Sequence, residues 1–134
     1  MTKPWIADWS PRLLSVLRII AGFMFMAHGT QKWLSFPAPR GSPTELFSLS
    51  GTAGVLELVG GFLLMIGLFT RPTAFILSGL MAFAYFIAHA PRGFWPLLNG
   101  GELAALYSFL FLYVAAAGGG PWSVDHMLRR SSAR

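Results

Sequence analysis

Four long apolar runs constrain this chain more than any other feature of its sequence. They cover residues 13–33, 51–69, 73–90 and 102–118, and the breaks between them are rich in proline and glycine. A helix rises 1.5 Å per residue, so runs of this length suit a hydrocarbon layer of roughly 30 Å. Because backbone groups in lipid must hydrogen-bond within their own segment, we expect helices. The sequence predicts an all-α membrane protein, a single domain over residues 1–134 that folds as a four-transmembrane-helix bundle.

The composition agrees with a lipid environment. Only 11% of the 134 residues are charged and 54% are hydrophobic, whereas soluble domains carry about 25% charged residues. A soluble fold of this size would lack the charge to cover its surface, so the lipid bilayer is the expected surrounding. The net charge of +5 does not indicate nucleic-acid binding, because the basic residues are scattered through loops and ends.

The basic residues also predict the topology. Cytoplasmic flanks of membrane helices carry an excess of Lys and Arg. With four crossings, six such residues fall on one side and three on the other: Lys3, Arg12, Arg71, Arg129, Arg130 and Arg134 against Lys32, Arg40 and Arg92. Both termini are therefore expected in the cytoplasm.

Short motifs along the chain carry a resemblance to a known family. The first run contains Arg18 and ends in His28-Gly29-Thr30-Gln31-Lys32, and the second contains Glu57 before Gly60-Gly61 and leads into Gly67-Leu68-Phe69-Thr70-Arg71. The third ends in Ala88-His89, the fourth opens with Asn99-Gly100-Gly101-Glu102, and a glycine-proline tail runs from Gly118 to Asp125. In this order and spacing, the motifs resemble the DoxX family of small bacterial membrane proteins over nearly the whole chain.

The resemblance implies a multi-pass protein of the bacterial cytoplasmic (inner) membrane with a redox association. Relatives include the small subunit of a thiosulfate:quinone oxidoreductase, and others are described as membrane partners in oxidative-stress complexes with thiol-handling enzymes. As an enzyme, the chain is therefore expected to be at most a subunit of a membrane oxidoreductase. Its expected partners are a redox protein or further copies of itself.

Polar side chains from all four runs are predicted to meet at one depth. Alternating helix directions place them in the outer half of the bilayer. The predicted polar pocket consists of His28, Lys32, Glu57, Tyr85, His89 and Glu102. Glu57 is expected to face the bundle, because Gly54, Gly60 and Gly61 share its helix face and small residues mark close helix contacts in membranes. Two charges fall nearer the inner side: Arg71 at the border, and Arg18, which is expected to snorkel toward the headgroups.

These residues also have structural interpretations. A charge near the middle of a bilayer costs about 2.5–3.5 kcal/mol on insertion scales, so such groups pair, line water or bind a ligand. Glu57 could form an ion pair with His28 or Lys32. Glu102 could be a favourable carboxylate at a helix N-terminus, and His89 a hydrogen-bonded histidine at the membrane interface.

Two ligand hypotheses follow from the predicted pocket. A quinone or similar amphiphile needs an apolar slot with hydrogen-bond donors and proton carriers, which His28, Glu57, Tyr85, His89 and Glu102 supply. We therefore expect a redox-associated membrane subunit that binds such a molecule. Haem held by His28 and His89 is a weaker alternative, because their estimated depths differ by roughly 6 Å. No metal site is predicted, since the paired Glu-x-x-His spacing of two-metal sites is absent.

Two further hypotheses assign the polar groups other roles. The chain could be a non-enzymatic membrane anchor or assembly partner of an oxidoreductase complex, because its loops are too short to form a catalytic domain. It could also be a small transporter with Glu57 as a proton carrier, although no inverted repeat with broken helices is visible.

Overall fold

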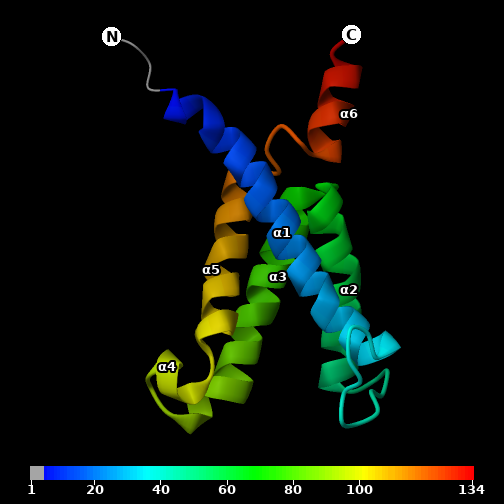
Figure 1. Ribbon diagram of the computed structural model, residues 1–134, viewed down its shortest axis with the longest axis vertical. Helices are drawn as coiled ribbons and strands as arrows, with labels where there is room; N and C mark the ends of the chain where they lie inside the picture. The colour runs from blue at the N-terminus through cyan, green and yellow to red at the C-terminus, as the bar shows by residue number, and fades with distance from the viewer. Residues whose placement is uncertain (1–4) are drawn as a thin grey trace.

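The structure is a computed structural model that describes residues 5–134 (Figure 1). Its elements are, in chain order, α1 (Ile6–Leu34), α2 (Leu49–Ile66), α3 (Thr70–Ala84), a π-helical turn η1 (Tyr85–His89), a 3-10 turn η2 (Ala90–Arg92), α4 (Pro96–Asn99), α5 (Glu102–Ala117) and α6 (Val124–Ser132). Residues 5–134 contain no strand, so the all-α prediction is confirmed for them. The predicted flank residue Lys3 lies outside the described residues.

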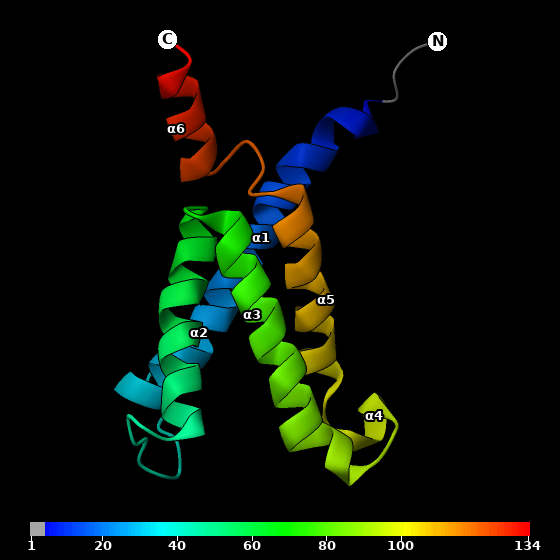
Figure 2. The same cartoon turned by 180° about the vertical axis from the view of Figure 1, so that it is seen from behind.

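Four helices, α1, α2, α3 and α5, form an elongated bundle with the start of α1 and the end of α6 on the same side (Figure 1). We call this the terminal end, and it also holds the α2–α3 turn and α6. The opposite end, called the α4 end, holds α4 and the loop that joins α1 to α2. Both views show α2 and α3 close together at their connecting turn and farther apart toward the α4 end (Figures 1 and 2).

Three helical stretches are long and apolar enough to cross a membrane. They are Ile6–Leu34, Leu49–Ile66 and Thr70–Arg92, the last of which combines α3, η1 and η2. Because α5 is apolar but has only 16 residues, a fourth crossing stays a prediction, as does the cytoplasmic position of the termini. The first helix starts seven residues before the predicted apolar run, and Asp8 in its first turn is favourable at a helix N-terminus.

Glycines let α1 and α2 pack backbone against backbone. Gly22 and Gly29 on α1 meet Gly61 and Gly54 on α2, and the two glycines of each helix are seven residues apart. A Cβ atom at Gly22 would lie 2.6 Å from the backbone nitrogen of Met65, and one at Gly29 would lie 2.7 Å from the Gly54 carbonyl oxygen. Small residues permit this close approach between membrane helices, so larger side chains would force the pair apart.

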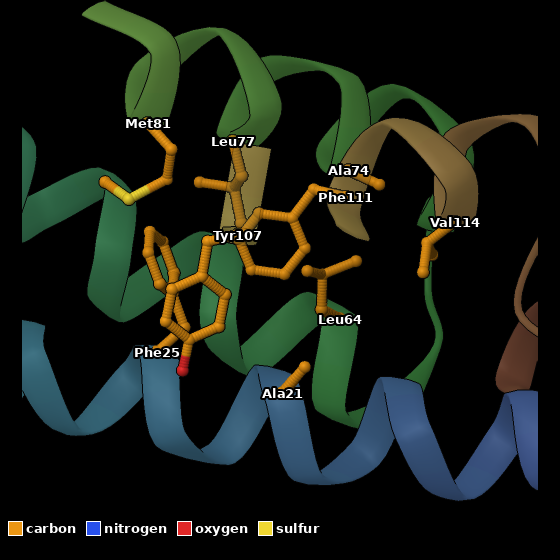
Figure 3. Packing of buried hydrophobic residues seen from close by; sticks show 9 residues of the cluster. All are labelled: Ala21, Phe25, Leu64, Ala74, Leu77, Met81, Tyr107, Phe111 and Val114. Atoms are coloured by element: carbon orange, nitrogen blue, oxygen red, sulfur yellow. The ribbon is translucent and has the colours of Figure 1, made fainter. Parts of the chain in front are cut away.

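The helices α3 and α5 form the second pair of the bundle. The Ser78 hydroxyl donates to the Ser108 carbonyl oxygen at 2.7 Å, and the Ser108 hydroxyl donates back to the Ser78 carbonyl oxygen at 3.0 Å. Hydrogen bonds between small polar residues join helices in membranes. An apolar core connects the helices, and it comprises Ala21, Phe25, Leu64, Ala74, Leu77, Met81, Tyr107, Phe111 and Val114 (Figure 3).

The third span changes its winding near the α4 end. The α-helix α3 passes into the π-helical turn η1 at Tyr85, and the Ala90 N–H donates to the Tyr85 carbonyl oxygen. Single π-helical turns are frequent at functional sites. Two of the residues predicted for the pocket, Tyr85 and His89, are the first and last residues of η1.

Candidate functional site

A cavity of about 290 Å³ lies toward the α4 end, between α1, α2, the end of α3 with η1, and α5. Its lining consists of Phe25, His28, Glu57, Met81, Ala84, His89, Gly100, Leu103, Ala104 and Tyr107. Three of the six predicted pocket residues, His28, Glu57 and His89, therefore border one cavity. A mostly apolar wall with a few polar groups is typical of small-molecule sites.

Glu57 enters the site from α2. It is 5% exposed and shares its buried face with Gly54, Gly60 and Gly61, so its predicted inward orientation is confirmed. Lys32 Nζ on α1 lies 2.8 Å from each carboxylate oxygen. The ion pair offsets the desolvation of Glu57, and it realises one of the two pairings expected from the sequence.

The π-helical turn contributes His89 and Tyr85, which Asn99 holds in place. Asn99 is buried, and its side-chain amide donates to the Tyr85 hydroxyl oxygen at 3.1 Å and to the Gly93 carbonyl oxygen at 2.9 Å. His89 Nδ1 lies 3.2 Å from the Asn99 carbonyl oxygen. Because a carbonyl oxygen only accepts, we assign the proton to Nδ1, which leaves Nε2 as the acceptor of the neutral ring.

Tyr107 on α5 was not among the predicted pocket residues. It is 5% exposed, and its hydroxyl oxygen is buried without a hydrogen-bond partner in residues 5–134. Its ring stacks on Phe111 and packs edge-on against Phe25, and Figure 3 shows the hydroxyl pointing toward α1. Buried hydroxyl groups are rarely left without a partner, so this hydroxyl remains able to hydrogen-bond to a ligand.

Glu102 is not placed with these residues. It is exposed at the first position of α5 and borders a separate surface hollow with Leu106 and Phe109. This position agrees with the structural alternative, in which the carboxylate interacts favourably with the helix N-terminus. Within residues 5–134, no group of three or more His, Asp or Glu side chains is arranged to hold a metal ion.

The expectation that Arg18 snorkels toward headgroups is wrong. Arg18 is 1% exposed, and its guanidinium donates to four backbone carbonyl oxygens. Two of them, from Leu64 and Met65, lie at the end of α2, where the Leu64 carbonyl oxygen also accepts from the Gly67 N–H. The other two, from Gly119 at 2.8 Å and Trp122 at 2.5 Å, belong to the segment between α5 and α6. Arg18 therefore joins three parts of the chain inside the protein.

Arg71 and Asp125 form further hydrogen bonds between segments of the terminal end. Arg71 donates to the last carbonyl oxygens of α5, and the Asp125 carboxylate accepts from the backbone N–H groups of Phe69 and Thr70 at 2.9 and 2.8 Å. Burial acts to raise the pKa of Asp125, but these hydrogen bonds and the charge of Arg129 outweigh it, so the pKa lies below its ordinary value. The turn motif and the tail motif of the sequence thus meet at one place.

Comparisons with known proteins agree on the family. The DoxX family model matches residues 13–90. An uncharacterized protein of Haemophilus influenzae is 48% identical over 131 residues, which cover 90% of this chain and 94% of that protein. An uncharacterized membrane protein of Mycobacterium tuberculosis is 27% identical over 144 residues, which cover 92% and 85% of the two chains. No solved structure gives a significant match. With its apolar helices and this match over more than half of its length, the chain is a multi-pass membrane protein that belongs to the DoxX family.

Proposed function

We propose that this protein is a redox-associated membrane subunit whose cavity binds a quinone or a similar amphiphile. The observation that carries the proposal is Tyr107, which lines the cavity of about 290 Å³ and whose buried hydroxyl has no partner in the described part of the chain. A quinone carbonyl oxygen is an acceptor for such a donor. The apolar lining suits a quinone ring, so the residues present fit this class of ligand.

The polar residues of the cavity would have distinct roles toward a quinone. Tyr107 would donate a hydrogen bond to one carbonyl oxygen. His89 would exchange a proton at Nε2, since its Nδ1 is engaged by Asn99. Glu57 would act as a second proton carrier, and its pairing with Lys32 would hold the carboxylate in place. When bound, the quinone would supply the two-electron chemistry that the side chains lack.

A stability measurement tests this ligand class. The full chain, purified in a mild detergent, is unfolded thermally with and without a short-chain ubiquinone analogue. We expect the analogue to raise the unfolding midpoint of the wild-type protein, because a ligand that binds only the folded state stabilises it. The rise should disappear in Glu57→Gln and persist in Glu45→Gln, which changes an exposed carboxylate in the α1–α2 loop. A full rise in Glu57→Gln would show that the cavity is not the binding site.

An optical spectrum separates the quinone proposal from the haem alternative. His28 and His89 both border the cavity, so a haem ligated by them would give a Soret band that shifts on reduction with dithionite. The quinone proposal expects no such band in the folded protein. A redox-sensitive band that is lost in His28→Ala or His89→Ala would replace quinone by haem.

The proposal includes four crossings of the bacterial inner membrane with both termini in the cytoplasm. The pairing of α5 with α3 supports an even number of crossings, as does the position of the start of α1 and of α6 at the same end of the bundle (Figure 1). The chain has no cysteine, so Ala38→Cys and Ser131→Cys each introduce a single thiol. An impermeant maleimide should label Ala38→Cys in intact spheroplasts and Ser131→Cys only after lysis. The reverse pattern would invert the proposed topology.

The projecting segments favour a second candidate function, an anchor or assembly partner of an oxidoreductase complex. The first turns of α1 and the helix α6 extend beyond the bundle at the terminal end (Figure 1). Met127 and Leu128 on α6 are 60% and 55% exposed. Under this function, the tagged chain should co-purify with an oxidoreductase from native membranes, and the double variant Met127→Gln/Leu128→Gln should reduce its yield. An unchanged yield would contradict a contact through α6.

A further inference from the structure

A second cavity lies at the terminal end, far along the bundle from Tyr107. It is a groove of about 550 Å³ between the start of α3, the segment that follows α5 and the first turns of α6. Among its lining residues are Arg71, His126, Arg129, Asp125, Phe69 and Pro72. We propose that this groove binds a phosphate group and that in the membrane the group belongs to the headgroup of an anionic phospholipid.

The charges of the groove favour an anion. Two arginines, Arg71 and Arg129, line the groove together with one carboxylate, that of Asp125. The imidazole of His126 also lines it. Both oxygens of Asp125 already accept from backbone N–H groups at the start of α3. The Asp125 carboxylate is therefore engaged by the N-terminus of α3. The two guanidinium groups outnumber it, so the groove carries a net positive charge.

The donors of Arg71 are only partly used within the protein. Its Nη1 donates to the carbonyl oxygens at the end of α5, whereas a guanidinium carries five N–H donors on three nitrogens. Arg71 is exposed, so its remaining donors are available to a ligand. Arginine recognises phosphate through such paired, charge-assisted hydrogen bonds.

The position of the groove favours a lipid as the source of the phosphate. It opens where the apolar helices end, since α3 begins at Thr70 and α5 ends at Ala117. Phe69 borders the groove and is 63% exposed beside the arginines. Phospholipids present an apolar glycerol and acyl region next to an anionic headgroup, which matches this pairing of an aromatic side chain with cations. A free phosphate ion would gain nothing from Phe69.

Two adjacent arginines provide a matched test. Arg129 lines the groove, whereas Arg130 borders a different hollow on α6. The full chain in detergent is titrated with dioctanoyl phosphatidylglycerol, dioctanoyl phosphatidylcholine and inorganic phosphate, and bound species are counted by native mass spectrometry. We expect phosphatidylglycerol to bind more tightly than phosphatidylcholine. The apparent Kd for phosphatidylglycerol should rise by about fivefold in Arg129→Gln and remain unchanged in Arg130→Gln.

The competition arm identifies the source of the phosphate. If inorganic phosphate does not displace phosphatidylglycerol, the site is one for a lipid headgroup. If inorganic phosphate binds alone and its binding weakens in Arg129→Gln, the groove is a phosphate site that is filled from solution. Equal weakening by Arg129→Gln and Arg130→Gln would mean that only the overall charge matters, and it would overturn the proposal, as would equal binding of the two lipids.

Discussion

Arg18 Nε on α1 donates a hydrogen bond at 2.8 Å to the carbonyl oxygen of Gly119, which is 101 positions away in the sequence. The same guanidinium donates to Leu64, Met65 and Trp122. One buried cation therefore connects the first helix, the end of the second and the segment that leads to α6. In a chain with few polar groups inside its bundle, this contact fixes how the terminal end is assembled.

Replacing Arg18 should destabilise the protein strongly. Arg18→Gln removes a buried guanidinium that donates to four carbonyl oxygens, and each hydrogen bond that involves a charged group contributes about 1.5–3 kcal/mol. We expect a loss of about 3 kcal/mol or more in the free energy of unfolding, measured by denaturant titration in mixed micelles. Arg12→Gln removes an exposed charge from the same helix and should cost less than about 1 kcal/mol. Equal effects of the two substitutions would contradict the structural role of Arg18.

The contact between α1 and α2 makes a prediction about two glycines. Gly22→Ala places a Cβ atom 2.6 Å from the backbone nitrogen of Met65, so the helices must separate, and we expect destabilisation by about 1–3 kcal/mol. Gly79→Ala on α3 meets nothing within 4 Å and should be neutral or stabilising by up to about 1 kcal/mol, because alanine favours helix. Thermal unfolding of both variants checks this, and a neutral Gly22→Ala would refute the close packing.

Because of Asp125, the stability of the folded protein should decrease at acidic pH. Its pKa in the folded protein is below the ordinary value of 3.8, so its contribution is fully present above that pH and is lost as the pH falls below 3.8. We therefore expect the wild-type unfolding midpoint to fall between pH 5 and about pH 3 by more than that of Asp125→Asn. At neutral pH, Asp125→Asn should be less stable by about 1–3 kcal/mol, because the hydrogen bonds to the N-terminus of α3 lose their charge. Parallel acid dependence in the two proteins would argue against this contact.

The ion pair between Lys32 and Glu57 predicts coupled effects. Lys32→Met leaves the buried carboxylate without its cation and should cost about 1–3 kcal/mol, since the lysine side chain is 17% exposed and water screens part of the loss. In Lys32→Met/Glu57→Gln both charges are gone, so the double variant should be more stable than the sum of the single effects predicts. A double-mutant cycle by thermal unfolding measures the coupling. Additive effects would mean that the pair contributes nothing to stability.

The inward position of Glu57 could be predicted from the sequence, whereas the role of Arg18 could not. Glu57 has glycines three positions before it and three and four positions after it on the same helix. This spacing within one helix indicates which face packs against a neighbouring helix. The partners of Arg18 are backbone carbonyl groups between 46 and 104 positions away, and every residue carries such a group. The sequence around Arg18 therefore does not indicate which carbonyl oxygens its guanidinium binds.

The estimated depth of a residue in the bilayer was also not sufficient to predict which residues line the cavity. Glu102 and Tyr107 both lie on α5 near the predicted level, but Glu102 faces outward and Tyr107 faces the cavity. The signal for Tyr107 was present in the helix periodicity, because Leu103 and Ala104 precede it on α5 by four and three positions and line the same cavity. The helix α6 also had a readable start, since Ser123 caps it by accepting from the His126 N–H.

The central claim, that the cavity binds a quinone-like amphiphile, is tested most directly by replacing Tyr107. Tyr107→Phe removes a hydroxyl with no partner in the described residues, so the protein without ligand should be as stable as the wild type. Tyr113→Phe removes an exposed hydroxyl from the same helix and serves as the control. The affinity for a short-chain ubiquinone analogue, measured by titration, should fall by about threefold to tenfold in Tyr107→Phe and not in Tyr113→Phe. Unchanged affinity in both variants would contradict the claim.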